Sequence, residues 1–204
     1  GPNGSGKTTL IKILCGLLQP TEGAVLVDGQ KVGPASKAII SYLPDRMYFA
    51  DWMKATDLFD LFADFYADFD RVRAMSMCAS LGVTPSDRLK SMSKGTKEKV
   101  QLVLVMARKA QLYLLDEPIA GVDPAARDFI LSTILTNYNE DGTVMISTHL
   151  ISDIEKVLDE AIFLKDGQIT LHDTVDNIRE RENKSVDALF RDVFRTHDLE
   201  GGAF

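Results

Sequence analysis

The chain begins with GPNGSGKTTL at residues 1–10, and this stretch carries the strongest structural signal in the sequence. Its spacing fits G-x-x-x-x-G-K-[ST], the pattern of a phosphate-binding loop. Glycines let the backbone curl so that successive N–H groups face phosphate oxygens, and the following helix adds its positive end. Lys7 is expected to reach the β- and γ-phosphates, and the Thr8 hydroxyl to hold Mg²⁺. The predicted nucleotide contacts are Gly1, Pro2, Asn3, Gly4, Ser5, Gly6, Lys7, Thr8 and Thr9.

A second acidic motif, LYLLDEP, lies at residues 112–118. Its apolar strand is expected to carry Asp116 to the C-terminal edge of the sheet, where open α/β sheets bind ligands. Asp116 is suited to hold Mg²⁺ directly or through water, and Glu117 is suited to accept a proton from an attacking water. The alternative is a pair of acids that merely ends a strand. The phosphate loop in the same chain favours the nucleotide interpretation.

Strand and helix patterns alternate through most of the chain. This alternation predicts an α/β fold with a parallel sheet and right-handed crossovers. The run VQLVLVMA could form a strand, but its length and the alternation around it favour a helix. Hairpins are expected to turn on Asp28-Gly29 and Asp166-Gly167. The expected strands are 38–43, 112–117 and 143–147, and the main expected helices are 7–18, 93–110, 124–138 and 151–158.

The segment 45–92 reads as mostly helical, with breaks at Gly82 and Pro85. Within it an amphipathic helix is expected to place its apolar residues on one side. Those residues are Leu58, Leu61, Phe62, Phe65 and Phe69. The predicted organisation is therefore a first core part (1–44), a helical subdomain (45–92), a second core part (93–173) and a helical tail (174–204).

Composition limits the classes of function. The 204 residues carry 23 Lys and Arg against 30 Asp and Glu, for a net charge of -7. This balance argues against a broad nucleic-acid-binding surface, which needs clustered basic residues. Cys15 and Cys78 are isolated, so neither a disulfide framework nor a paired metal site is expected. No apolar run approaches the ~20 residues of a membrane span.

With these motifs in order, the sequence resembles the ATP-binding-cassette (ABC) ATPases over nearly its whole length. MSKGTKE at 92–98 is similar to their signature segment, and AGVDP at 120–124 looks like their D-loop. STHL at 147–150 carries His149 where the family has its switch histidine. The resemblance implies a P-loop NTPase (RecA-like) parallel sheet with an inserted α-helical subdomain. ISYLPD, the helical segment and VDALFRDVF are most similar to ATPases of ABC-2-type exporters in Gram-positive bacteria.

The resemblance also implies a mechanism and partners. In this family two cassettes, identical or different, sandwich two ATPs and drive transport through separate membrane-spanning permease subunits. The protein would lie on the cytoplasmic face of the cell membrane, bind ATP and Mg²⁺, and bind no nucleic acid. The implied roles are catalysis for Glu117 and His149, metal binding for Thr8, Asp116 and Asp45, contact with the partner's ATP for Ser93, Lys94, Gly95 and Thr96, and a D-loop acid at Asp123. One alternative is a cassette ATPase of translation or DNA repair, although the helical insert here has no heptads and the sequence shows one cassette. A second alternative is a catalytically idle binding or regulatory module, which the intact Lys7, Asp116, Glu117 and His149 argue against.

Three departures from the family pattern bear on these expectations. Asp45 stands where Gln is usual, so it either senses the metal or simply caps the following turn. Lys94 and Thr96 replace the common Gly and Gln of the signature. The family also has strands before the phosphate loop, including an aromatic residue that stacks on adenine. The sequence is therefore expected to be an N-terminally truncated cassette.

Overall fold

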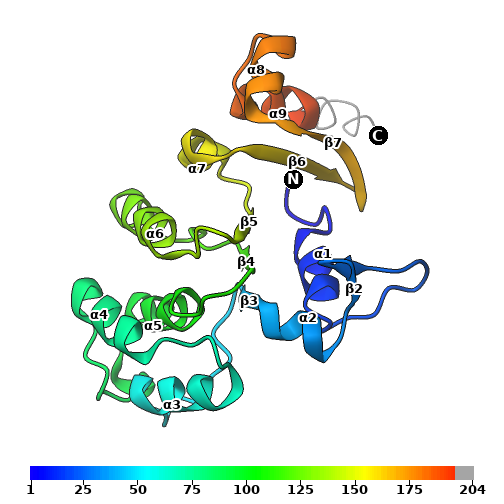
Figure 1. Cartoon of the computed structure of the whole chain (residues 1–204). Coiled ribbons are helices and arrows are strands. Elements are labelled where there is room, and N and C mark those ends of the chain that lie inside the picture. The colour runs from blue at the N-terminus through cyan, green and yellow to red at the C-terminus, as the bar shows by residue number, and fades with distance from the viewer. Residues whose placement is uncertain (196–204) are drawn as a thin grey trace, which may run out of the picture.

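The computed structural model describes residues 1–195, and it confirms the predicted α/β fold around a parallel sheet (Figure 1). The sheet has the order β3 (Ile40–Leu43), β4 (Leu112–Asp116) and β5 (Thr143–Ser147). All its pairings are parallel, with Leu43 opposite Leu115 and Asp116 opposite Ser147. The acidic end of β4 therefore lies at one edge of the sheet, beside the end of β5.

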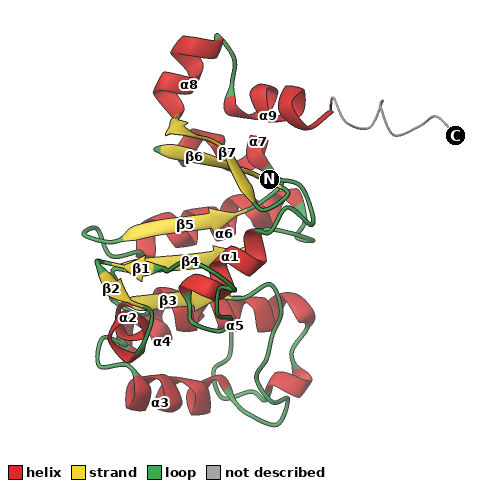
Figure 2. Ribbon diagram, turned by 90° about the vertical axis from the view of Figure 1, so that its right-hand side faces the viewer, coloured by secondary structure: helices red, strands yellow, loops and turns green. Residues whose placement is uncertain are grey.

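The two faces of β4 are covered by different layers (Figure 2). Since side chains alternate along a strand, Leu114 faces one way and Tyr113 and Leu115 face the other. Leu114 packs with Ile11 of α1 (Lys7–Leu14) in a small apolar cluster. Tyr113 and Leu115 belong to the largest core, together with α5 (Lys94–Met106). The VQLVLVMA run forms the second half of α5 with Ala107 as its C-cap, which confirms the helical interpretation.

The first predicted hairpin is confirmed. β1 (Leu26–Val27) and β2 (Gln30–Lys31) pair antiparallel, and both turn residues have positive φ, 51° at Asp28 and 71° at Gly29. The prediction of a strand from residue 38 is wrong at its start, because α2 (Pro34–Ile39) occupies that segment. Proline at the start of a helix is favourable, since its fixed φ suits the first turn and its missing N–H would be unpaired anyway.

The segment 45–92, predicted as a helical subdomain, contains α3 (Ala55–Phe65), α4 (Arg71–Leu81) and the short 3-10 helix η1 (Leu89–Ser91). Leu58 and Phe59 of α3 are fully buried, but Phe65 is 75% exposed and Leu61 also reaches the surface. The predicted apolar face is therefore partly wrong. Ala55, Leu58 and Phe59 are buried and Phe62 is partly buried, and this spacing leaves 61 and 65 at the edge of the stripe.

Arg108 joins this subdomain to the sheet. It follows α5, is 1% exposed, and binds Asp68 through two ion-pair hydrogen bonds of 2.9 and 3.0 Å. The same guanidinium donates to the backbone carbonyls of Ala38 and Ile40, next to β3 and in it. The Tyr66 ring lies 3.7 Å from its central carbon. The charge of the buried Arg108 is therefore paired, and this side chain links the end of α5 to Asp68 and to the backbone at Ala38 and Ile40.

The C-terminal part adds α6 (Pro124–Asn137), α7 (Ile151–Ile154) and the 3-10 helix η2 (Glu155–Val157). The hairpin of β6 (Glu160–Lys165) and β7 (Gln168–Thr174) turns on Asp166-Gly167, as predicted. The helical tail comprises α8 (Val175–Glu182) and α9 (Val186–Arg195). Residues 196–204 of the predicted tail lie outside the described residues. None of the helices within residues 1–195 is long and apolar enough to cross a membrane.

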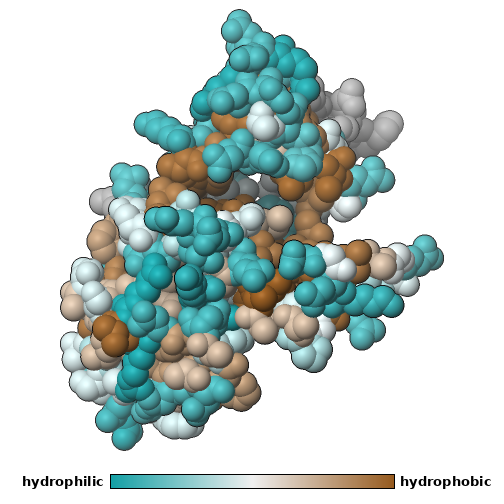
Figure 3. Space-filling model, in the orientation of Figure 1, coloured by the Kyte–Doolittle hydropathy of each residue, from teal (hydrophilic) through white to brown (hydrophobic). Residues whose placement is uncertain are grey.

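Two further features of the fold concern the surface and the thiols. Figure 3 shows hydrophobic side chains beside α1 and along the β6–β7 hairpin. The exposed apolar residues include Leu17, which follows α1, Leu26 in β1 and Ile169 in β7. Both cysteines are buried, and burial raises the pKa of Cys15 to about 12 and that of Cys78 to about 11. These thiols therefore stay neutral, which keeps them unreactive at ordinary pH.

Candidate functional site

The phosphate-binding loop leads into α1 with its first turn open. Gly4 and Gly6 have φ of 82° and 103°, and no side chain caps the helix. Among the described hydrogen bonds, none is donated by the backbone N–H groups of Lys7, Thr8 or Thr9. Unpaired N–H groups at a helix N-terminus attract anions, because they carry the positive end of the helix dipole. The geometry suits a phosphate group.

Gly1 and Ser5 show how tightly the loop is enclosed. A Cβ on Gly1 would lie 2.3 Å from the carbonyl oxygen of Leu164, so glycine is required there by close approach. Ser5 Oγ is buried and has no hydrogen-bond partner within residues 1–195. A buried hydroxyl without a partner costs free energy unless a ligand satisfies it. The loop thus presents both N–H groups and a hydroxyl to a ligand.

Lys7 lies across the phosphate-binding loop. Its Nζ donates to the carbonyls of Gly1 at 2.8 Å and Pro2 at 3.0 Å. It also forms an ion pair with Glu117, 3.2 Å from Oε1, and both side chains are largely buried. A phosphate that enters the loop would therefore compete with Glu117 for the Lys7 charge.

Glu117 lies at the centre of the site. Its Oε2 is 3.0 Å from Nδ1 of His149, which the end of β5 brings to the same edge of the sheet. The Glu117 backbone has φ of 50°, an uncommon conformation for a residue other than glycine. Its N–H donates to both the carbonyl (3.0 Å) and the hydroxyl (3.1 Å) of Ser147, and these bonds hold that conformation.

Asp116 and Ser147 form the floor of the site. Ser147 Oγ donates to Asp116 Oδ1 at 2.5 Å, while Asp116 Oδ2 is buried and has no hydrogen-bond partner in the described chain. A buried carboxylate oxygen without a donor fits a cation such as Mg²⁺ directly or through water. Sequence reasoning missed Ser147. Its position could have indicated a role, because Ser147 ends the strand next to that of Asp116 and lies two residues before His149.

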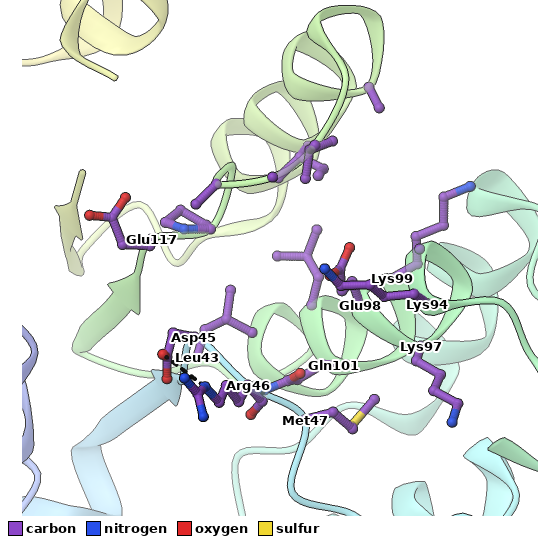
Figure 4. A pocket seen from close by; sticks show the side chains of 18 of the residues that line it. Leu43, Asp45, Arg46, Met47, Lys94, Lys97, Glu98, Lys99, Gln101 and Glu117 are labelled. Atoms are coloured by element: carbon purple, nitrogen blue, oxygen red, sulfur yellow. Dashed lines mark hydrogen bonds and ion pairs between the residues drawn. The ribbon is translucent and has the colours of Figure 1, made fainter. Parts of the chain in front are cut away.

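The signature segment lines a separate part of the site. A cavity of about 710 Å³ is bounded by the start of α5, by Asp45 and Arg46, by Glu117, and by the loop 120–123 (Figure 4). Ser93 Oγ caps α5 by accepting from the N–H of Thr96 at 3.1 Å. Lys94 is 84% exposed and lies 3.7 Å from Glu98 in an ion pair. The structure thus brings Lys7, Asp116, Glu117 and His149 together, and puts Ser93, Lys94, Gly95 and Thr96 at another wall.

Asp45 lies at the junction of the sheet and the helical subdomain. Its carboxylate is partly exposed and forms an ion pair with Arg46 at 3.7 Å. Gln101, which sequence reasoning missed, anchors this loop by donating to the carbonyls of Pro44 (3.4 Å) and Arg46 (3.3 Å). Residues 1–195 contain no group of three or more His, Cys, Asp or Glu side chains placed for a metal. A magnesium ion needs few side-chain ligands, since it retains waters and binds substrate phosphates.

Asp123 caps α6, because its Oδ1 accepts from the N–H of Ala126 at 3.1 Å. The loop 120–123 therefore runs along the cavity wall into a well-defined helix start.

Comparisons with known proteins agree with this site. A sequence profile described as ABC transporter matches residues 1–120. The ABC transporter ATP-binding protein YtrB of Bacillus subtilis is 30% identical, over 95% of this chain and 67% of its own length. YxlF of the same organism, also named an ABC transporter ATP-binding protein, is 29% identical over 91% of this chain and 64% of its own.

Solved structures agree as well. One titled as the ATP-binding subunit of an ABC transporter is 26% identical, with a TM-score of 0.80 over 94% of this chain and 85% of its own. The chain spans 50–64% of the length of three of the curated relatives that it matches.

Proposed function

The chain belongs to the ABC transporter family, and we propose that it is the ATP-binding and ATP-hydrolysing subunit of a membrane transporter, an exporter. One observation supports this most strongly. Lys7 from the phosphate loop and His149 from the end of β5 converge on the two oxygens of Glu117, at 3.2 and 3.0 Å. A cation for phosphate, a carboxylate and an imidazole in direct contact are the groups that nucleotide hydrolysis needs.

Binding begins at the open first turn of α1. The N–H groups of residues 6–9 and the Ser5 hydroxyl receive phosphate oxygens, and the terminal phosphate takes Lys7 as its ion partner. This exchange separates Lys7 from Glu117, so the glutamate carboxylate becomes available to a water molecule. Thr8 and Asp116 Oδ2 would hold Mg²⁺, which offsets phosphate charge when it is bound.

Hydrolysis then depends on Glu117 and His149. Glu117 accepts a proton from the water that attacks the terminal phosphate, as a general base within hydrogen-bond reach of it. His149 orients that carboxylate through its Nδ1, and its other ring nitrogen is left to face the phosphate. The Ser147 bonds to the Glu117 backbone keep the carboxylate in place, so little reorganisation is needed during the reaction.

The start of α5 serves a second nucleotide. In a dimer of cassettes, Ser93, Lys94, Gly95 and Thr96 face the terminal phosphate bound by the partner's loop, and the exposed Lys94 adds a positive charge there. Asp123 lies at the same interface, and Asp45 links the metal site to the helical subdomain. Trp52 and Phe65 are exposed on that subdomain and suit contact with the membrane-spanning subunits at the cytoplasmic face of the membrane.

The test is Mg²⁺-dependent ATP turnover by the intact protein and by Glu117→Gln. Loss of the general base should lower turnover by ~10²–10⁴-fold and leave ATP binding in place. Glu160→Gln is a matched control, because Glu160 also pairs with a histidine, His172 at 2.8 Å, but on the exposed β6–β7 hairpin. Turnover by Glu117→Gln within a few-fold of the parent would rule out Glu117 as the base.

A further inference from the structure

Arg127 connects a loop and a short helix beside the site. It lies in the first turns of α6, and its Nε donates to the carbonyl of Val122 at 2.9 Å. Its Nη1 donates to Asp153 Oδ2 in α7 at 2.8 Å. Val122 belongs to the loop 120–123 that lines the cavity, and α7 begins two residues after His149. We propose that Arg127 is a positioning residue that makes the position of His149 depend on the conformation of the loop 120–123.

The geometry of this bridge requires an arginine. A guanidinium presents several N–H groups in a rigid fork, so one side chain can hold a carbonyl and a carboxylate in different directions. The ammonium of lysine is a compact group that favours one of the two. Arg127 and Asp153 are 24% and 29% exposed, so solvent screens their ion pair less than it screens a surface pair.

Apolar packing supports the polar bridge. Ile119, directly before the loop, is buried in one cluster with Leu131 of α6 and Ile154 of α7. Leu150, next to His149, packs against the same cluster. Because packed side chains have few alternative arrangements, α6 and α7 should shift as a unit. Arg127 adds the backbone of Val122 to this unit, so a displaced loop pulls on the element that carries His149.

The proposal rests on the function proposed above and extends it. A partner cassette that presses on the loop 120–123 would displace the Val122 carbonyl. Arg127 would follow it, and through Asp153 the start of α7 would move as well. Nδ1 of His149 is 3.0 Å from Oε2 of Glu117, so a small displacement of His149 changes its hydrogen bond to the proposed base. Hydrolysis would then follow closure of the dimer rather than ATP binding alone.

The experiment follows the environment of the His149 imidazole directly and does not depend on ATP turnover. Gly121 has φ of 71° and open space where a Cβ would project, so Gly121→Ala strains the loop without creating a clash. We record the imidazole resonances of His149 by NMR in the intact protein, with Gly121→Ala placed in the parent and in Arg127→Met. His172, on β7 in the separate hairpin, serves as the internal control.

The expected result is that Gly121→Ala shifts the His149 resonance in the parent, and that Arg127→Met reduces this shift at least threefold. Arg127→Lys should restore stability but not the full shift. No shift in the parent, or an equal shift in both backgrounds, would overturn the proposal. If Arg127→Met does not fold, Asp153→Asn removes the same ion pair and should reduce the shift in the same way.

ATP turnover is measured on the same proteins. A parent that hydrolyses no ATP contradicts the proposed function, while the resonance shifts still decide the role of Arg127. In an active parent, Arg127→Met should lower kcat severalfold and leave KM for ATP within about twofold. A change confined to KM would overturn the positioning role.

Discussion

The N-termini of α1 and α5 border the site, and they differ in how they are capped. At α5, Ser93 caps the helix with its own hydroxyl, which accepts from the N–H of Thr96. At α1, no side chain caps the helix, and the preceding residue is Gly6 in the left-handed region. The two starts also differ in packing, since α5 is buried in the largest core and α1 packs against a small cluster. A capped start is complete within the protein, whereas an open start is stabilised further by an anion.

A third N-terminus shows another solution. α9 is capped by Glu155 from η2, whose oxygens accept from the N–H groups of Val186 (2.9 Å) and Asp187 (3.2 Å). Arg179 adds an ion pair at 3.2 Å. Here a buried carboxylate from a distant segment takes the place that we assign to phosphate at α1. The three helices therefore differ in the source of the cap, which is the adjacent Ser93 at α5, the distant Glu155 at α9 and no side chain at α1. Substitutions can test this difference.

The largest effect is expected at the open helix. Lys7→Ala removes the charge that meets the phosphates and leaves Glu117 buried without its ion partner. A hydrogen bond to a charged group contributes about 1.5–3 kcal/mol, so ATP affinity should fall on the order of 100-fold. Equilibrium binding of ATP to the intact protein measures this. Lys12→Ala is the control, since Lys12 lies in the last turn of the same helix, and equal losses in both variants would contradict a site at the N-terminus.

A smaller effect is expected at α9, and it depends on pH. Burial alone would raise the pKa of Glu155, but the N–H groups of Val186 and Asp187 and the Arg179 guanidinium hold it below its ordinary value of 4.5. Glu155→Ala should lower the free energy of unfolding by about 1–3 kcal/mol at pH 7, because the donors lose a buried acceptor. Chemical denaturation monitored by circular dichroism measures the loss.

The sign of the pH dependence follows from the lowered pKa. The contribution of Glu155 is fully present above the unfolded value near 4.5, and it is lost as the pH falls through the folded pKa. The stability difference between the parent and Glu155→Gln should therefore shrink when the pH drops from 6 toward about 3. A difference that stays constant over this range would show that Glu155 acts through packing instead.

The smallest effect is expected at the self-capped helix. Ser93→Ala should cost about 1 kcal/mol of stability, the usual value of an N-cap. Ser93→Asp should retain the cap, because a carboxylate also accepts from the N–H at the third helical position. Under our proposal, however, its negative charge repels the partner's terminal phosphate and weakens ATP-dependent dimerisation, which light scattering detects. If both variants dimerise like the parent, α5 faces no phosphate.

Much of the fold could be predicted from the sequence because the relevant signals are local. Asp28-Gly29 and Asp166-Gly167 predict hairpins, Gly82 marks the end of α4, and alternation separates helix from strand in the VQLVLVMA run. The resemblance implied that Glu117 and His149 act at one site, but it did not predict direct contact between them. The fold explains their contact at 3.0 Å, since both follow strands whose C-terminal ends share one edge of a parallel sheet.

The parts that sequence analysis missed depend on contacts between distant segments. In the sequence, nothing distinguishes Arg108 from a surface arginine. In the structure it is buried and donates to Asp68 and to the carbonyl of Ile40. Glu155 caps a helix 31 residues further along the chain. Pairings of this kind leave no periodicity in the sequence, so only the packed structure reveals them.

The contact between the β6–β7 turn and the phosphate loop bears on how the protein is made. The N–H of Gly167 donates to the carbonyl of Ser5 at 3.0 Å, and Gly1 packs against Leu164. Synthesis at about 5–20 residues per second separates these two segments by roughly 8–30 s. During that interval the ribosome-bound chain has a phosphate loop without its supporting turn. Under our proposal, the nascent protein therefore gains its full affinity for ATP only after the β6–β7 turn has been synthesised, so nucleotide cannot drive the earlier steps of its folding.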